Sequence, residues 1–225
     1  NILASSWEVA SQAHERPEVW RAVLGISWFW LVGAAVISQF PNYAKEYLGG
    51  DNHVVTLFLA LNSVGIGCGS LAANRILRGA ITARLVPWSA LAMGVFTFDL
   101  WLASPAPQTA MAVGGVAAFL AVARNWRIVC DLIGVAVAAG IFVVPLYAIM
   151  QARSDESERA RVVAGNNILN ALFIVVAGGG SAIMLNFGSG VPAIFLVLGV
   201  SNAALAAALA LRRRGLLRPR SPPLR

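Results

Sequence analysis

Charged residues are scarce in this sequence. Only 12% of its 225 residues are Asp, Glu, Lys or Arg, whereas a soluble domain carries about 25%. Apolar residues make up 58%. No charged residue lies between Arg161 and Arg212, and that stretch is long enough for two membrane spans of about 20 residues each and a turn. This composition is unlike that of a water-soluble globule and predicts a multispan integral membrane protein.

Cysteine and histidine are also rare. The chain has two cysteines, Cys68 and Cys130, and two histidines, His14 and His53, and none has a partner at metal-ligand spacing. A disulfide scaffold, a thiolate zinc site and a histidine metal centre are therefore not expected. No activated nucleophile or pair of carboxylates indicates chemistry within these residues, so we expect no cofactor and no enzymatic activity.

The net charge of +7 has a simple explanation in a membrane protein. The basic residues lie beside hydrophobic segments and not on a soluble face with interleaved aromatic residues, so the pattern indicates membrane orientation and no nucleic acid. We expect the arginine cluster after the last apolar segment to bind anionic headgroups of membrane lipids. Its members are Arg212, Arg213, Arg214, Arg218 and Arg220.

Seven apolar segments follow one another along the chain. They are Ala22–Phe40, Val54–Ala73, Leu85–Ser104, Gln108–Ala123, Leu132–Met150, Val162–Phe187 and Val191–Leu211. The fourth is the shortest, and as a helix it would be about 24 Å long, less than the hydrocarbon core of about 30 Å. We therefore expect six spans, with Gln108–Ala123 in the outer interface beside Trp126.

The distribution of basic residues supports six spans. If Gln108–Ala123 does not cross, 14 of the 17 basic residues lie on the side of both termini, and only Lys45, Arg124 and Arg127 lie outside. If it crosses, seven lie inside and 10 outside, which inverts the positive-inside rule. The predicted organisation is an interfacial cytoplasmic lead-in at residues 1–21, a six-helix domain at 22–211 and a basic cytoplasmic tail at 212–225. In the lead-in we expect a short interfacial helix, which Pro17 breaks. Because the sequence begins with Asn1, we expect it to be a piece of a longer product.

Glycines within the apolar segments predict close helix packing. Gly65, Gly67 and Gly69 lack the strand and helix that a phosphate-binding loop needs, so packing is the favoured interpretation. We expect the same role for Gly178, Gly179 and Gly180.

Several stretches carry a resemblance to one transporter family. They are Leu24–Trp30 (LGISWFW), Gln39–Pro41 (QFP), His53–Leu57 (HVVTL), Phe142–Gln151 (FVVPLYAIMQ) and Val163–Phe173 (VAGNNILNALF). The chain from about Trp20 to Leu211 resembles helices seven to twelve of bacterial lysophospholipid transporters of the major facilitator superfamily. It is most similar to the branch that is fused to an acyltransferase and an acyl carrier protein synthetase.

This resemblance implies an all-α membrane protein in which six transmembrane helices form one half of a major facilitator fold. It also implies lysophospholipid translocation across the bacterial inner membrane, with both termini cytoplasmic. The implied partners are the N-terminal transporter half and a fused or associated acyltransferase. Two alternatives remain open, a membrane domain of a bifunctional acyltransferase and a general facilitator of small molecules.

Polar residues within the spans are the candidate substrate-binding residues. Asn166 and Asn170 stand four positions apart and share one helix face, with Ser181 near the same face. Interhelical hydrogen bonds and a polar lining of the transport path both explain such amides. Asn167 and the Asn62–Ser63 pair, which we expect to be buried, complete the candidate set.

Two carboxylates and a group of arginines are the remaining candidates. Asp99 and Asp131 could couple transport to an ion or proton, or they could be solvated or paired with arginine, Asp131 with Arg127. Gly69-Ser70-Leu71 resembles the start of the superfamily's Gly-x-Leu-x-Asp-Arg loop signature, with Ala73 at the Asp position. The candidate cytoplasmic gate comprises Gly69, Arg75, Arg78, Arg153, Arg159 and Arg161. A solvated turn that anchors the topology is the alternative for the last three arginines.

Overall fold

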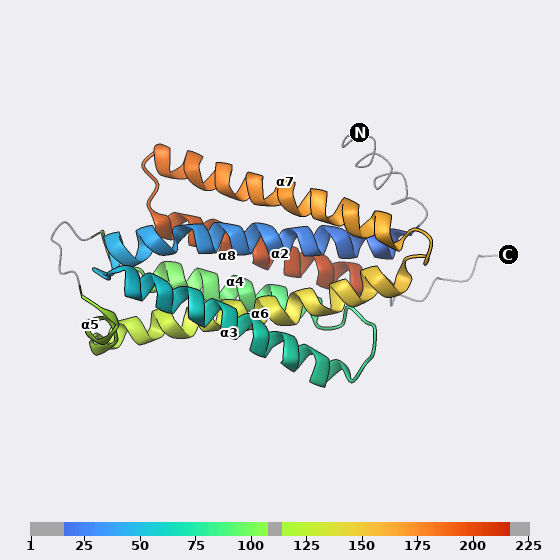
Figure 1. Ribbon diagram of the computed structural model, residues 1–225, viewed down its shortest axis with the longest axis horizontal. Coiled ribbons are helices and arrows are strands. Elements are labelled where there is room, and N and C mark those ends of the chain that lie inside the picture. Colours follow the sequence, from blue (N-terminus) through green and yellow to red (C-terminus); the bar gives the residue numbers. More distant parts are fainter. Residues whose placement is uncertain (1–15, 108–113, 217–225) are drawn as a thin grey trace.

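The computed structural model describes residues 16–107 and 114–216 of the chain. The regular secondary structure of these residues is helical (Figure 1). Its elements are α2 (Pro17–Asn42), the π-helix η1 (Tyr43–Tyr47), α3 (Asn52–Leu77), α4 (Val86–Ala103), α5 (Val116–Ala121), α6 (Ala123–Arg153), α7 (Arg159–Asn186) and α8 (Val191–Leu216).

Six of these helical segments are long and apolar enough to cross a membrane. They match the six predicted spans in number and place, and they support an integral membrane protein. Within the predicted interfacial segment Gln108–Ala123, residues 108–113 lie outside the described part, and α5 is only six residues long. The Trp126 Nε1 donates a hydrogen bond to the Leu120 carbonyl at 3.0 Å, so α5 lies against the start of α6, beside Trp126 as expected.

The helix ends of two spans differ from the prediction. Pro17 begins α2 instead of breaking a helix, because proline at the first helical position loses no hydrogen bond. The first span continues past Pro41 and ends at Tyr47, since the backbone widens into the π-helix η1. Helix α6 begins at Ala123, ahead of the predicted Leu132. The lead-in predicted for residues 1–21 is therefore helical from Pro17 onward, and residues 1–15 lie outside the described part.

Two sets of three consecutive spans, α2–α4 and α6–α8, pack mainly against each other and only slightly within themselves. Helix α2 packs against α7, and α6 packs against α3. In addition, α4 packs against α8, and α2 packs against α6. Figure 1 shows that α2 and α6, the first helix of each set, run in opposite directions. Exchanging α2, α3 and α4 for α6, α7 and α8 preserves these contacts, whereas the close contact of α4 with α6 has only a small counterpart between α8 and α2. The packing therefore matches an inverted repeat in part.

Aromatic residues join the helices at the end of the bundle that holds η1 and α5. The ring of Phe58 lies 5.6 Å from both Phe40 and Phe119, and Tyr43 packs edge to face on Phe195 at 5.1 Å. The Tyr43 hydroxyl lies 2.8 Å from the Ser104 hydroxyl oxygen. These rings come from α2, η1, α3, α5 and α8, so the cluster holds these elements together at this end of the bundle.

Glycines permit the closest helix contact, between α3 and α6. A Cβ atom on Gly69 would meet the backbone of Val137 at under 3.0 Å, and one on Gly65 would meet Ala136. These contacts confirm the predicted packing role of Gly65 and Gly69. Gly67, Gly178, Gly179 and Gly180 have nothing within 4 Å in the described structure, so the prediction is wrong for these four.

Basic residues separate between the two ends of the bundle. Lys45, Arg124 and Arg127 lie at the end that holds η1 and α5. The ends of α3 and α6 and the starts of α2 and α7 lie at the opposite end, where Arg16 forms an exposed ion pair with Asp155. The Arg153 Nε there lies 3.8 Å from a Glu18 carboxylate oxygen. The two ends therefore differ in charge as the six-span prediction requires.

Candidate functional site

A buried polar seam lies between α2 and α7. We define the polar seam as Ser27, Asn166 and Asn170, which are at most 6% exposed. The Ser27 hydroxyl donates a hydrogen bond of 2.9 Å to the Asn170 Oδ1. Asn166 and Asn170 do share the buried face of α7, as their spacing predicts, and Ser181 lies on it as well. The bond to Ser27 makes Asn170 a helix-to-helix contact.

Asn166 is the unusual member of the polar seam. Its side chain is 1% exposed, and neither its Nδ2 nor its Oδ1 has a hydrogen-bond partner among the described residues. A buried amide without partners costs about 1–3 kcal/mol per unsatisfied group, so such groups in native proteins are usually met by water or a ligand. Asn166 is therefore the residue of the polar seam that is best placed to bind a polar group from outside the chain.

A second polar contact joins α2 to α8. The indole nitrogen of Trp28 donates to the Asn202 Oδ1 at 2.9 Å, and the Asn202 Nδ2 donates to the Leu198 carbonyl at 2.9 Å. Sequence reasoning missed Ser27 and Trp28 as polar partners. Both residues stand in an apolar run, and only the packing of α2 against α7 and α8 shows what they contact.

The other predicted substrate-binding residues do not join the polar seam. Asn167 is exposed on α7, and Asn62 is half-buried on α3. The prediction that Asn62 and Ser63 form a buried pair is wrong for Ser63, because Ser63 is exposed and its hydroxyl bonds the Leu59 carbonyl of its own helix. Helices α3 and α7 pack on different partners and lie at opposite edges of the bundle in Figure 1.

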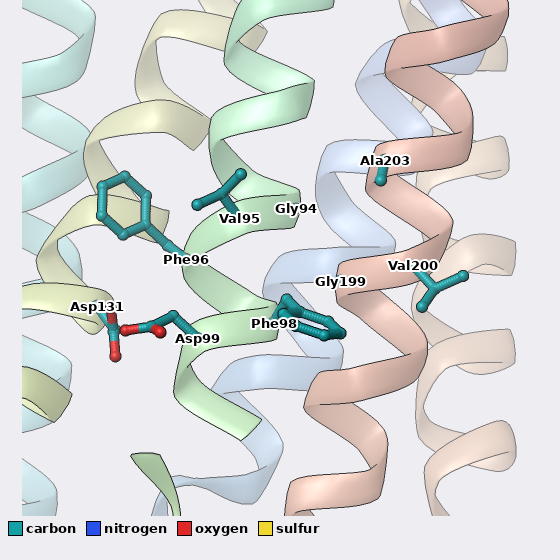
Figure 2. Close-up of a pocket in the computed structure, with 9 residues that line it drawn as sticks. All are labelled: Gly94, Val95, Phe96, Phe98, Asp99, Asp131, Gly199, Val200 and Ala203. Carbon is teal, nitrogen blue, oxygen red and sulfur yellow. The ribbon is translucent and has the colours of Figure 1, made fainter. Parts of the chain in front are cut away.

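The two candidate carboxylates lie next to each other, on α4 and α6 (Figure 2). Arg127 binds Asp99, with Nε 2.9 Å from Oδ2 and Nη2 2.5 Å from Oδ1. The predicted pairing of Arg127 with Asp131 is therefore wrong, because the side chain of Arg127 reaches across to α4. Asp131 is 3% exposed, and its Oδ2 has no hydrogen-bond partner among the described residues.

A pocket of about 440 Å³ begins at these carboxylates and crosses α4 towards α8. We call it the carboxylate pocket. Its remaining lining is glycine, alanine and apolar side chains, among them Val95, Phe98, Val200 and Ala203. Gly94 and Gly199 also line it, at the place where α4 and α8 approach each other backbone to backbone. The pocket therefore has one acidic end and a long apolar part.

The candidate gate residues lie on three helices. Gly69 packs inside the α3–α6 contact, whereas the five arginines lie exposed near the opposite end from η1. They are Arg75, Arg78, Arg153, Arg159 and Arg161. Of these, Arg153 lies near Glu18, and its backbone carbonyl accepts a 2.8 Å hydrogen bond from the Arg16 Nη1.

The hydrogen bond between Ser27 and Asn170 provides a stability prediction. We expect Ser27→Ala and Asn170→Leu each to destabilise the protein and their combination to cost less than the sum, with a coupling of about 0.6–2 kcal/mol. The measurement is a double-mutant cycle of unfolding in detergent micelles. Strict additivity of the two changes would show that the bond contributes nothing to stability.

Neither a metal-binding cluster in the described residues nor a similar known protein is found for this chain. Among residues 16–107 and 114–216, no group of three or more His, Cys, Asp and Glu side chains could hold a metal ion. No family model, curated protein or solved structure matches the chain. Its six apolar helices nevertheless assign it to the helical integral membrane proteins.

Proposed function

We propose that this chain forms one half of a transporter of the major facilitator type and that its cargo is a lysophospholipid. The observation that carries the proposal is that exchanging the sets α2–α4 and α6–α8, whose first helices run in opposite directions, preserves the pairing of α2 with α7, α3 with α6 and α4 with α8. Inverted three-helix repeats build each half of such transporters. The family resemblance of Phe142–Gln151 and Val163–Phe173 supports the choice of cargo.

Helices α3 and α7 are the flanks on which a second half would act. In the most apolar window of α7 only 17% of the residues are buried, and in that of α3 only 28%, the two lowest values among the six spans. Large apolar side chains cover both helices, such as Leu59 and Val64 on α3 and Leu172 and Val175 on α7. Lipid or a second six-helix unit would cover these surfaces, and rocking of the two units would open a path alternately to each side.

Asn166 is the proposed cargo contact in this half. Its amide donors and acceptor have no partner among the described residues, and they suit the phosphate and hydroxyl groups of a lysolipid headgroup. The amide is buried in the conformation seen here, so it would meet cargo only when α7 shifts against α2. Asn170 and Ser27 would hold the two helices in register in this conformation.

The orientation proposed for the bundle follows the positive-inside rule. The end that contains Arg16, Arg153 and Arg159 would face the bacterial cytoplasm, and the end that contains η1 and α5 would face outward. The exposed pairs Arg16–Asp155 and Arg153–Glu18 would then belong to the cytoplasmic gate. Asp131 is the carboxylate proposed for ion coupling, since Arg127 already neutralises Asp99.

A flipping assay tests the proposal. Proteoliposomes with this chain alone should move fluorescent lysophosphatidylethanolamine no faster than protein-free vesicles, because one wall does not enclose a path. Coexpression with the first six helices of a bacterial lysophospholipid transporter should restore movement. A soluble cationic dye serves as the second cargo. Movement of the dye but not of the lysolipid would contradict the proposed cargo, and rapid flipping by the chain alone as a monomer would contradict the half-transporter.

A further inference from the structure

The carboxylate pocket has the chemistry of a phospholipid site. We propose that it binds a membrane phospholipid with a primary amine in its headgroup, the ammonium at Asp131 and an acyl chain along Val95, Val200 and Ala203 (Figure 2). This site is separate from the proposed cargo contact, because it lies across α4, α6 and α8 and shares no residue with the polar seam. Its acidic residue, Asp131, is also the carboxylate proposed for ion coupling, so a bound lipid would take the place of the coupling ion there.

Charge at the acidic end favours a single positive group. Arg127 uses Nε and Nη2 on Asp99, which leaves the pair neutral. Asp131 adds one more carboxylate, 3% exposed, whose Oδ2 has no partner in the described structure. An uncompensated carboxylate in a membrane protein is costly, and a cation that donates hydrogen bonds removes that cost. A primary ammonium has three donors and matches this need.

The depth of the pocket favours a lipid over a soluble amine. Asp99 lies four residues before the end of α4, about 6 Å along the helix axis, where headgroups would lie. Val95 lies one turn further into the bilayer on α4, and Ala203 lies deeper than Gly199 on α8. The exposed side chains Val95 and Val200 continue the apolar part to the surface of the bundle. The acidic end is thus at headgroup level and the apolar part at acyl-chain level.

Arg127 supplies the second half of headgroup recognition. Its side chain is 51% exposed, and no hydrogen bond from its Nη1 to the described residues is found. A phosphodiester next to Asp131-bound ammonium would meet this guanidinium, which prefers phosphate oxygens. A phosphoethanolamine headgroup therefore suits both charges. A choline headgroup has no N–H donor, and a glycerol headgroup has no cation for Asp131.

Native mass spectrometry of the purified chain provides the test. The chain is mixed in detergent with equimolar phosphatidylethanolamine, phosphatidylcholine and phosphatidylglycerol. We expect phosphatidylethanolamine to be bound with about tenfold preference, the effect of one charge-assisted hydrogen bond. Asp131→Asn should abolish the preference, and Asp131→Glu should keep most of it. Equal binding of the three lipids, or an unchanged preference in Asp131→Asn, would overturn the proposal.

A second pair of variants leaves the buried carboxylate intact. Val200→Trp fills the apolar part of the carboxylate pocket from an exposed position and should lower phosphatidylethanolamine binding about tenfold. Val197→Trp is the matched control, since Val197 is equally exposed on α8 but does not line the pocket. Equal binding by both variants would contradict the site. Displacement of the lipid by free phosphoethanolamine at the same concentration would also contradict it, because the acyl chain would then add nothing.

Discussion

Replacing Gly69 with alanine is expected to destabilise the protein strongly, whereas the same change at Gly67 is expected to be neutral or stabilising. A Cβ at Gly69 would overlap the backbone of Val137, so α3 and α6 would have to separate. Forced overpacking costs about 1–3 kcal/mol and can cost more when backbone must move. Gly67 has no described neighbour within 4 Å of an added Cβ, and alanine there gains up to about 1 kcal/mol of helix propensity.

Thermal unfolding of the two variants in the same detergent measures this difference. Gly67→Ala is a matched control, because it lies on the same helix two residues away and makes the same chemical change. The melting temperature should fall for Gly69→Ala and stay or rise for Gly67→Ala. Equal melting temperatures would show that α3 and α6 do not touch at Gly69.

Replacing Asn166 with leucine is expected to reduce lysolipid flipping at least about tenfold in the coexpressed transporter. Leucine removes the donors and the acceptor that the proposed headgroup contact needs, and loss of one hydrogen bond to a charged group corresponds to about 1.5–3 kcal/mol. The fold should persist or gain stability, because the amide has no partner among the described residues. Flipping is measured per folded molecule in proteoliposomes.

Asn202→Leu separates a cargo contact from a structural one. Asn202 is also a buried amide, but it bonds Trp28 and the Leu198 carbonyl. We expect this change to lower stability and leave flipping per folded molecule unchanged. If Asn166→Leu behaves in the same way, Asn166 does not contact the cargo.

Hydropathy predicts the number of spans but not where the helices end. The apolar segment predicted for this helix begins only at Leu132, because Arg124, Arg127 and Asp131 before it are charged. Helix α6 includes all three, since Asp99 on another helix neutralises Arg127. Pro41 is a second example. The sequence pattern ends the first span just before this proline, but the span continues past it through the π-helix η1. Both outcomes depend on tertiary contacts or backbone geometry that no local pattern contains.

The candidate site is predictable in part for the same reason. The spacing of Asn166 and Asn170 correctly gives a shared face of α7, because helical periodicity is local. The spacing cannot show that Ser27 bonds Asn170 and that Asn166 has no partner among the described residues, since both depend on the register of α2 against α7. A glycine likewise permits close approach of another helix but does not show whether one lies there. Gly69 packs against α6, whereas Gly178 has no described neighbour within 4 Å.

The most direct test of the proposed half-transporter is side-specific cysteine labelling, because that proposal requires six crossings and a non-crossing α5. Single cysteines replace Thr82, Ser157, Asn52 and Ser189 in intact cells, after Cys68 and Cys130 are changed to serine. We predict that Thr82→Cys and Ser157→Cys are labelled only from the cytoplasm and that Asn52→Cys and Ser189→Cys are labelled only from outside. Labelling of Thr82→Cys and Ser157→Cys from opposite sides would mean that the segment around α5 crosses the membrane, and the two sets of helices would then not be inverted.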